Sequence, residues 1–138
     1  MTITLDTSGL LALFDRKDPE LRACLAVFEE DGGPYLVSVA ILSEVAWFFG
    51  KRFPSRVEDA FLDDLERDAY TLDWDKADAR RIHQLTKRYR DLGLGIADAA
   101  VVACAERNGG RILTTDWRHF PVVARGEKSI TVLPVSRE

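Results

Sequence analysis

The segment Thr2-Ile3-Thr4-Leu5-Asp6-Thr7-Ser8-Gly9-Leu10-Leu11, at residues 2–11, decides the fold class of this chain. Residues 2–5 form a short β-branched and apolar run, which predicts a buried strand that stops at Asp6. Large apolar side chains then recur at helical spacing, at Leu10, Leu11, Leu13 and Phe14. A buried strand that leads directly into a helix is the unit from which α/β sheets are built.

The same alternation of strands and helices continues along the chain. Further strands are predicted at residues 35–38, 70–73, 111–114 and 130–133. Further helices are predicted at residues 39–49, 54–66, 75–90 and 97–106, with one more between Asp18-Pro19-Glu20 and Gly32-Gly33. The pattern predicts an α/β protein with three α/β/α layers, in which helices flank a central, mostly parallel sheet. Because no repeat or flexible linker interrupts it, we expect a single domain over residues 1–138.

Composition excludes two broad classes of protein. Hydrophobic residues make up 46% and charged residues 30% of the 138 residues, which is typical of a globular domain and not of a disordered chain. No apolar run approaches the roughly 20 residues that a membrane helix needs. The net charge of −4 disfavours a protein that holds nucleic acid by bulk charge alone. A nuclease stays compatible with it, because acidic residues that hold metal ions are neutralised when those ions bind.

The N-terminus and the cysteines predict where the protein works. The chain opens with residues 1–6, MTITLD, and the acid comes too early for a secretory signal peptide. The two cysteines, Cys24 and Cys104, form neither a disulfide framework nor a zinc-binding pattern. We therefore expect a cytoplasmic protein in a reducing environment, with no membrane association.

Four acidic residues carry the functional prediction. Asp6 directly follows the first predicted strand, and Asp116 follows the strand at residues 111–114. Glu44 lies on the helix after the second strand, and Asp98 lies at the start of the helix at residues 97–106. Ligands of parallel sheets bind beyond the carboxyl ends of the strands, so we expect these four carboxylates to meet at one edge.

A divalent cation is the simplest reason for four carboxylates to share one edge. Like charges a few ångströms apart repel each other, and a hard cation removes that conflict. Oxygen ligands without cysteine or histidine suit Mg²⁺ or Mn²⁺ better than zinc. Mg²⁺ keeps several waters, and one of these can become a nucleophile, which predicts hydrolytic chemistry.

Each acid also has a structural interpretation that the sequence leaves open. Asp6 fits a cap for the helix that follows it, and Asp98 fits a first-turn acid favoured by the helix dipole. Asp116 fits a loop acid after a strand. Glu44 fits a solvated helix residue, although its apolar neighbours make that role less comfortable. The four acids together argue more strongly than any one of them.

Four segments of the chain resemble sequences of one known family. They are LDTSGLLAL at residues 5–13, SVAILSEV at 38–45, IADAAVVACA at 96–105 and ILTTDWRHF at 112–120. All four occur in order and span nearly the whole chain, and each contains one of the four acids. The chain thereby resembles PIN-domain proteins, specifically VapC-type toxins of bacterial and archaeal toxin–antitoxin pairs. Some relatives have a further Asp, and others a His, where this chain has His119.

The resemblance implies a PIN-like fold and an Mg²⁺- or Mn²⁺-dependent endoribonuclease that is the toxin of a VapBC-type pair. One or two ions would be held by Asp6, Asp98 and Asp116, with Glu44 as a ligand or as the base that orients water. Metal-activated water would attack phosphorus and leave 5′-phosphate and 3′-hydroxyl ends. The implied partners are an RNA substrate, a cognate VapB-type antitoxin and a second copy of the chain in a homodimer. A PIN-domain ribonuclease that serves RNA processing without an antitoxin is the alternative.

Basic and aromatic residues are candidates for contacts with RNA. A basic run at residues 76–90 fits either phosphate contacts or a solvated helix face. Trp117 fits either base stacking or core packing, and it directly follows Asp116. The candidates are Arg80, Arg81, Lys87, Arg88, Trp117, Arg118 and His119.

Three further features stay open in the sequence. Ser8 and Thr114 stand near the acids and would either orient their carboxylates or serve as a helix cap and a strand residue. His83 and His119 would be the acid and base of a competing, metal-free ribonuclease mechanism. The aromatic residues 47–49 stand in a row on one predicted helix and cannot all face the core, so we expect part of this cluster at the surface.

Overall fold

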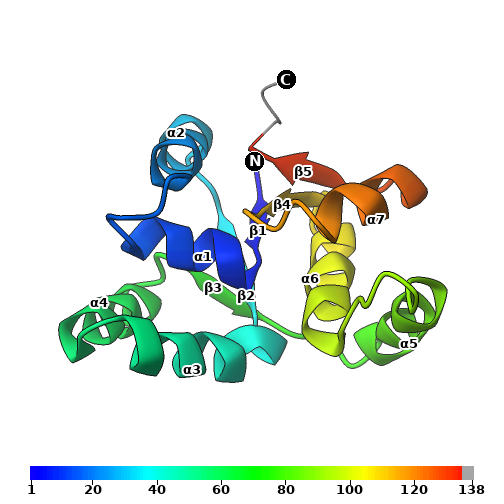
Figure 1. The fold of residues 1–138 in the computed structure, drawn as a ribbon, viewed down its shortest axis with the longest axis horizontal. Coiled ribbons are helices and arrows are strands. Elements are labelled where there is room, and N and C mark those ends of the chain that lie inside the picture. Colours follow the sequence, from blue (N-terminus) through cyan, green and yellow to red (C-terminus); the bar gives the residue numbers. More distant parts are fainter. Residues whose placement is uncertain (135–138) are drawn as a thin grey trace.

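Five short parallel strands form the centre of the fold in the computed structural model, which describes residues 1–134 (Figure 1). They are β1 (Ile3–Leu5), β2 (Tyr35–Ser38), β3 (Thr71–Asp73), β4 (Arg111–Leu113) and β5 (Thr131–Leu133), in the spatial order β3-β2-β1-β4-β5. Each neighbouring pair is parallel. β1 lies in the middle of the sheet and is buried at all three residues, as its apolar and β-branched sequence predicts.

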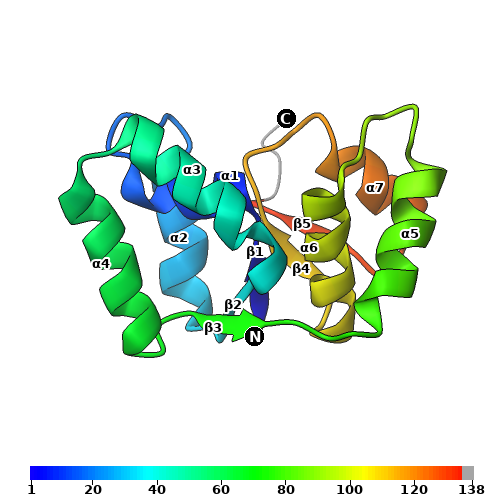
Figure 2. The same ribbon diagram turned by 90° about the horizontal axis from the view of Figure 1, so that it is seen from below.

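Helices cover both faces of the sheet in the described part of the chain. They are α1 (Thr7–Phe14), α2 (Leu21–Asp31), the 3₁₀ helix η1 (Val39–Ile41), α3 (Leu42–Arg52), α4 (Ser55–Glu66), α5 (Asp78–Arg88), α6 (Ile96–Arg107) and α7 (Phe120–Gly126). Figures 1 and 2 show α1 to α4 on one side and α5 to α7 on the other. The predicted three-layer α/β/α fold with a parallel sheet is confirmed. No helix within residues 1–134 has the length and apolar character that crossing a membrane requires.

Some element boundaries differ from the sequence predictions. The helix predicted at residues 75–90 begins at Asp78 in α5, because Oδ1 of Asp75 accepts the N–H of Ala77 at 2.8 Å in a turn before the helix. Helix α7 has no counterpart among the predictions, since a seven-residue helix with a proline in its first turn shows no clear periodicity. The expectation of one domain over residues 1–138 stays a prediction, and its last four residues lie outside the described part.

Helix α6 is buried along most of its length and lies against the sheet. Residues 99–105 are all buried, and their small alanine, valine and cysteine side chains let the helix pack closely on β1, β2 and β4. Since α6 leads into the parallel strand β4, it begins at the carboxyl edge of the sheet and runs back toward the opposite edge. Asp98, in its first turn, is thereby fixed at the carboxyl edge.

The aromatic cluster at residues 47–49 divides between core and surface. Phe49 is only 2% exposed and packs against Phe14 and Phe61. Trp47 is 59% exposed, so the prediction that part of the cluster lies at the surface is confirmed. Cys24 and Cys104 are buried and unpaired, as expected of small core residues.

Strands β1 and β4 bring two predicted site segments together. Leu5 pairs with Leu113 in the parallel register, and the N–H of Asp6 donates to the carbonyl oxygen of Leu113 at 3.2 Å. At Gly9, in α1, a Cβ would lie 2.2 Å from that same carbonyl oxygen. Only glycine fits at this crossing, so Gly9 allows α1 to start directly over the end of β4.

Candidate metal-binding active site

Asp6 lies buried where β1 meets α1, with only 4% of its surface exposed. Its Oδ1 accepts hydrogen bonds from the backbone N–H of Gly9 at 2.7 Å and from Oγ of Ser8 at 2.9 Å. Its Oδ2 accepts from Oγ1 of Thr114 at 2.6 Å. The bond from Gly9 makes Asp6 the N-cap of α1, so the capping interpretation is confirmed. Capping occupies only part of the carboxylate and does not exclude a second role.

Burial controls the charge of Asp6. Desolvation raises the pKa of this carboxyl from 3.8 to about 7, although hydrogen bonds from Thr114, Gly9 and Ser8 lower it. The nearby charge of Asp98 raises this pKa further. Without a cation, Asp6 therefore holds a proton over part of the neutral pH range. A bound cation would favour the charged form and release that proton.

Asp116 is held in a fixed orientation by the loop that follows β4. Its backbone N–H donates to Oγ1 of Thr114 at 2.9 Å. Its Oδ1 accepts the backbone N–H groups of Arg118 and His119, both at 3.0 Å. Its Oδ2 lies 2.8 Å from Nδ1 of His119. Asp116 is thus a loop acid after a strand, as one interpretation of the sequence predicts. These hydrogen bonds also restrict the orientation of its carboxylate.

Asp98 links Asp116 to the rest of the acids. Desolvation raises the pKa of its carboxyl, and the charges of Asp116 and Glu44 raise it further, whereas His119 lowers it. Within the described residues, Asp98, Asp116 and His119 each offer one ligand atom within 4.8 Å of those of the other two. Oxygen donors with one imidazole suit a divalent cation, so this group fits a metal ion.

Asp6 and Glu44 lie near this group without belonging to it. Glu44 is exposed in the first turn of α3, which fits its interpretation as a solvated helix residue, and its role in catalysis stays a prediction. The neighbours Val45 and Ile41 turn inward, and Glu44 turns outward. Its charge nevertheless acts on Asp98, which places it at the same edge.

His119 lies beside two of the predicted acids. The sequence made it a candidate contact for RNA, half of a competing metal-free pair, and a position where some relatives have a further Asp. The structure places its ring beside Asp98 and Asp116. The partner in that pair, His83, lies exposed on α5 and has no place in this group. The sequence signal for this contact is the three-residue spacing between Asp116 and His119, because a short turn over that spacing brings the imidazole back to the carboxylate of Asp116.

The candidates for RNA contacts fall into two groups. Arg81 donates to Glu106 at 2.8 Å and to Glu127 at 2.6 Å, and Arg88 lies 2.9 Å from Glu127. These ion pairs hold α5 to α6 and to the end of α7, so Arg81 in particular has a structural role. Other candidates are exposed residues, namely Arg80, Lys87 and Arg118, and Trp117 is 41% exposed. The core-packing interpretation of Trp117 is therefore wrong.

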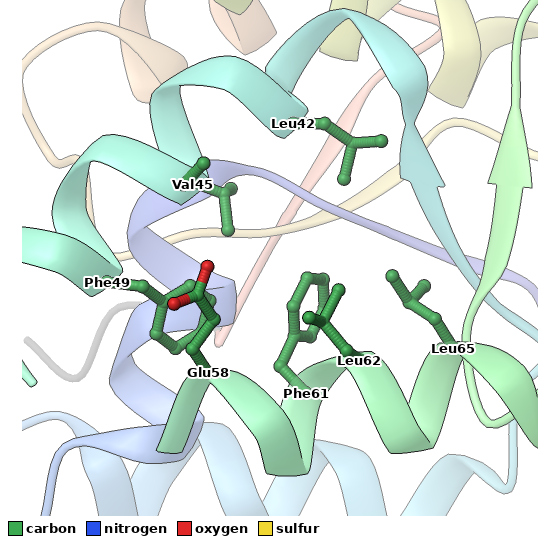
Figure 3. A pocket seen from close by; sticks show the side chains of 8 residues that line it. Leu42, Val45, Phe49, Glu58, Phe61, Leu62 and Leu65 are labelled. Atoms are coloured by element: carbon green, nitrogen blue, oxygen red, sulfur yellow. The ribbon is translucent and has the colours of Figure 1, made fainter. Parts of the chain in front are cut away.

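An apolar groove lies between α3 and α4, and Figure 3 shows side chains from both helices facing into it. Its lining residues are Leu42, Val45, Ala46, Phe49, Glu58, Phe61, Leu62 and Leu65. None of the four predicted acids lines this groove. The chemistry of the molecule is therefore expected at the carboxyl edge of the sheet.

The PIN-domain sequence profile matches residues 3–126, which span all four acids and His119. The chain belongs to the PIN-domain family. Among curated relatives of this PIN domain is Ribonuclease VapC26 of Mycobacterium tuberculosis, which is 33% identical over 133 residues, covering 94% of this chain and 98% of that protein. The recognition of a VapC-type PIN domain from the sequence is confirmed.

Solved structures of low sequence identity share the fold of this PIN domain. VapC20 of Mycobacterium tuberculosis, described as a toxin that cleaves the sarcin-ricin loop, superposes with a TM-score of 0.66 at 17% identity, covering 78% of this chain and 84% of that one. VapBC2 of Rickettsia felis, solved with a DNA fragment from its promoter, gives a TM-score of 0.67 at 14% identity, covering 96% of this chain and 97% of that one. At these identities the likeness establishes the fold.

Proposed function

We propose that this PIN domain is a metal-dependent endoribonuclease and the toxin of a VapBC-type pair. The observation that carries the proposal is the meeting of Asp98 and Asp116 within 4.8 Å, beside buried Asp6, in a chain 33% identical to a VapC ribonuclease. PIN domains are metal-dependent nucleases, so the family and the donor set agree. The identity of the cation, Mg²⁺ or Mn²⁺, belongs to the proposal.

Each acid has a distinct task in the proposed hydrolysis of RNA. A bound divalent cation supplies positive charge that stabilises the transition state and makes a water molecule more acidic. Asp98 and Asp116 hold this cation, and Asp6 adds a third carboxylate whose orientation is fixed by Ser8 and Thr114. Glu44 is exposed to solvent at the same edge and accepts a proton from the attacking water or orients it. The products carry 5′-phosphate and 3′-hydroxyl ends.

Substrate RNA is proposed to cross the carboxyl edge beside the acids. Trp117 is half-exposed one residue after Asp116, where an unstacked base can pack on its ring. Arg118 is exposed next to it and fits a phosphate contact. Arg80 and Lys87 extend positive charge along α5.

The proposed protein partners follow from membership of the VapC group. A VapB-type antitoxin would silence the nuclease, and the chain would act in the cytoplasm as a homodimer. Exposed Trp47, on α3, is a candidate for one of these interfaces, because a large apolar side chain that is 59% exposed gains free energy when a partner covers it.

The decisive experiment is cleavage of RNA by the purified chain with Mg²⁺ or Mn²⁺, with excess EDTA, and with the variant Asp6→Asn. Asp59→Asn serves as the matched control, because Asp59 is an exposed acid on α4. We expect metal-dependent cleavage with 5′-phosphate ends that is lost in Asp6→Asn and kept in Asp59→Asn. Cleavage that survives both EDTA and Asp6→Asn would contradict the proposal.

A further inference from the structure

We propose that the imidazole of His119 is a ligand of the metal ion in this site, which makes the site selective for first-row transition ions such as Mn²⁺ over Mg²⁺. This inference rests on the proposed metal-dependent function and goes beyond its four acids. It assigns a nitrogen donor where the sequence predicts only oxygen donors.

The position of the ring is the first argument. A ligand atom of His119 lies within 4.8 Å of ligand atoms of both Asp98 and Asp116, and this is the only such group of acids, cysteines or histidines within residues 1–134. The side chain of His119 is 20% exposed, which leaves it half-enclosed and still accessible to an ion.

The contact with Asp116 is the second argument. Nδ1 of His119 lies 2.8 Å from Oδ2 of Asp116. Two ligand atoms at adjacent positions of one divalent ion lie about 3 Å apart, because each is about 2.1 Å from the ion. The ring nitrogen and the carboxylate oxygen therefore already have the spacing of two neighbouring ligands.

Two structural roles for this side chain fail to explain its placement. His119 precedes α7 at the N-cap position, yet its side chain makes no capping hydrogen bond to that helix. Asp116 does not need the ring for its orientation either, because two backbone N–H groups already hold its Oδ1. The ring is therefore directed toward the acids without a structural task that requires it there.

A nitrogen donor changes which cation the site prefers. Mg²⁺ binds oxygen ligands and gives up its waters reluctantly, so an imidazole adds little to its affinity. First-row transition ions accept imidazole readily, and their affinity for mixed nitrogen and oxygen sites rises along the series from Mn²⁺ to Co²⁺. Removal of His119 should therefore weaken the binding of Mn²⁺ and Co²⁺ more than that of Mg²⁺.

The test uses the full chain with no affinity tag, because added histidines bind the same ions. Mn²⁺ is bound to metal-free protein, and pulsed electron paramagnetic resonance measures nitrogen coupling to the ion. Labelling histidine with ¹⁵N identifies a histidine ligand by the change in that coupling, without any variant. We expect a histidine coupling in the native chain and in His83→Ala, which removes the exposed histidine of α5, and its loss in His119→Asn.

Calorimetry with MgCl₂ and MnCl₂ gives the second readout. We expect His119→Asn to weaken Mn²⁺ binding by about 10-fold or more and Mg²⁺ binding by about 2-fold or less. Native protein that binds Mn²⁺ without histidine coupling, or a variant that loses both ions equally, would overturn this inference and leave the ribonuclease proposal intact. Native protein that binds neither ion would overturn both.

Discussion

The hydroxyl of Thr114 donates a hydrogen bond of 2.6 Å to Oδ2 of Asp6. Oγ1 of Thr114 also accepts the backbone N–H of Asp116 at 2.9 Å, and it lies 3.1 Å from Oγ of Ser8. One buried side chain thus connects the acid after β1 to the acid after β4. A valine would keep the shape of Thr114 and remove both hydrogen bonds.

The variant Thr114→Val tests this connection. We expect its metal affinity or cleavage rate to fall about 10- to 100-fold, because partners that orient metal-binding carboxylates typically contribute that much. Thr131→Val, at an exposed position on β5, is the matched control and should behave like the native chain. Equal metal affinity and equal rates in both variants would show that the hydroxyl of Thr114 does not position the acids.

Burial of Asp6 predicts how stability depends on pH in the metal-free protein. Because its pKa is about 7 in the folded state and 3.8 in model compounds, folding takes up a proton between these values. The charged carboxylate therefore destabilises the fold progressively as pH rises from about 4 to 7, by at most about 4 kcal/mol. Below pH 4 the group is protonated in both states and this penalty is absent.

The variant Asp6→Asn removes this charge and keeps a good N-cap residue. Its Tm should exceed that of the metal-free native chain at pH 8, and the difference should shrink toward pH 4. Thermal unfolding in EDTA at both pH values measures this. A Tm difference that is the same at the two pH values would contradict a buried, partly protonated Asp6. Divalent cations should stabilise the native chain more than the variant at pH 8.

The fold was predictable from the sequence because it depends on strong local signals. The run at residues 2–5 and the small-residue helix at 97–106 each have one clear interpretation, and their alternation determines a parallel sheet. Helix α7 was not predictable in this way, since seven residues give too few turns to show a period. Arg81 also differed from expectation, because the carboxylates of Glu106 and Glu127 that bind it come from distant parts of the sequence.

The candidate site was predictable only as a set of acids at one edge. The position of each acid after a strand or at a helix start is visible in the sequence, but the distances among them depend on packing. The structure separates the tight group of Asp98, Asp116 and His119 from buried Asp6 and exposed Glu44. The sequence could not rank the four acids by burial, because residue type and spacing say nothing about it.

Gly9 gives a steric test of the close approach between α1 and the end of β4. Gly9→Ala would place a Cβ 2.2 Å from the carbonyl oxygen of Leu113 and 3.1 Å from Oδ1 of Asp6. We expect a loss of several kcal/mol in the free energy of unfolding, because backbone on both sides must move. Gly50→Ala in α3 meets no atom within 4 Å and should stabilise the fold by up to about 1 kcal/mol. Chemical denaturation of both variants measures the contrast, and equal stability would contradict the close approach of α1 to β4.

Of the two arginines at the start of α5, one has a structural role and the other is available to contact RNA. Arg80 is exposed, whereas Arg81 bonds Glu106 and Glu127, the latter a buried acid. We expect Arg80→Gln to weaken binding of single-stranded RNA about uniformly across sequences and to lower the salt dependence of binding, with little change in Tm. Arg81→Gln should instead lower the free energy of unfolding by about 1 to 3 kcal/mol, since the buried Glu127 loses one partner and keeps Arg88 and Tyr89. RNA titrations at several salt concentrations measure the contribution of each arginine to RNA binding, and thermal unfolding of both variants measures its contribution to stability. A lowered Tm in Arg80→Gln together with an unchanged Tm in Arg81→Gln would reverse the two roles.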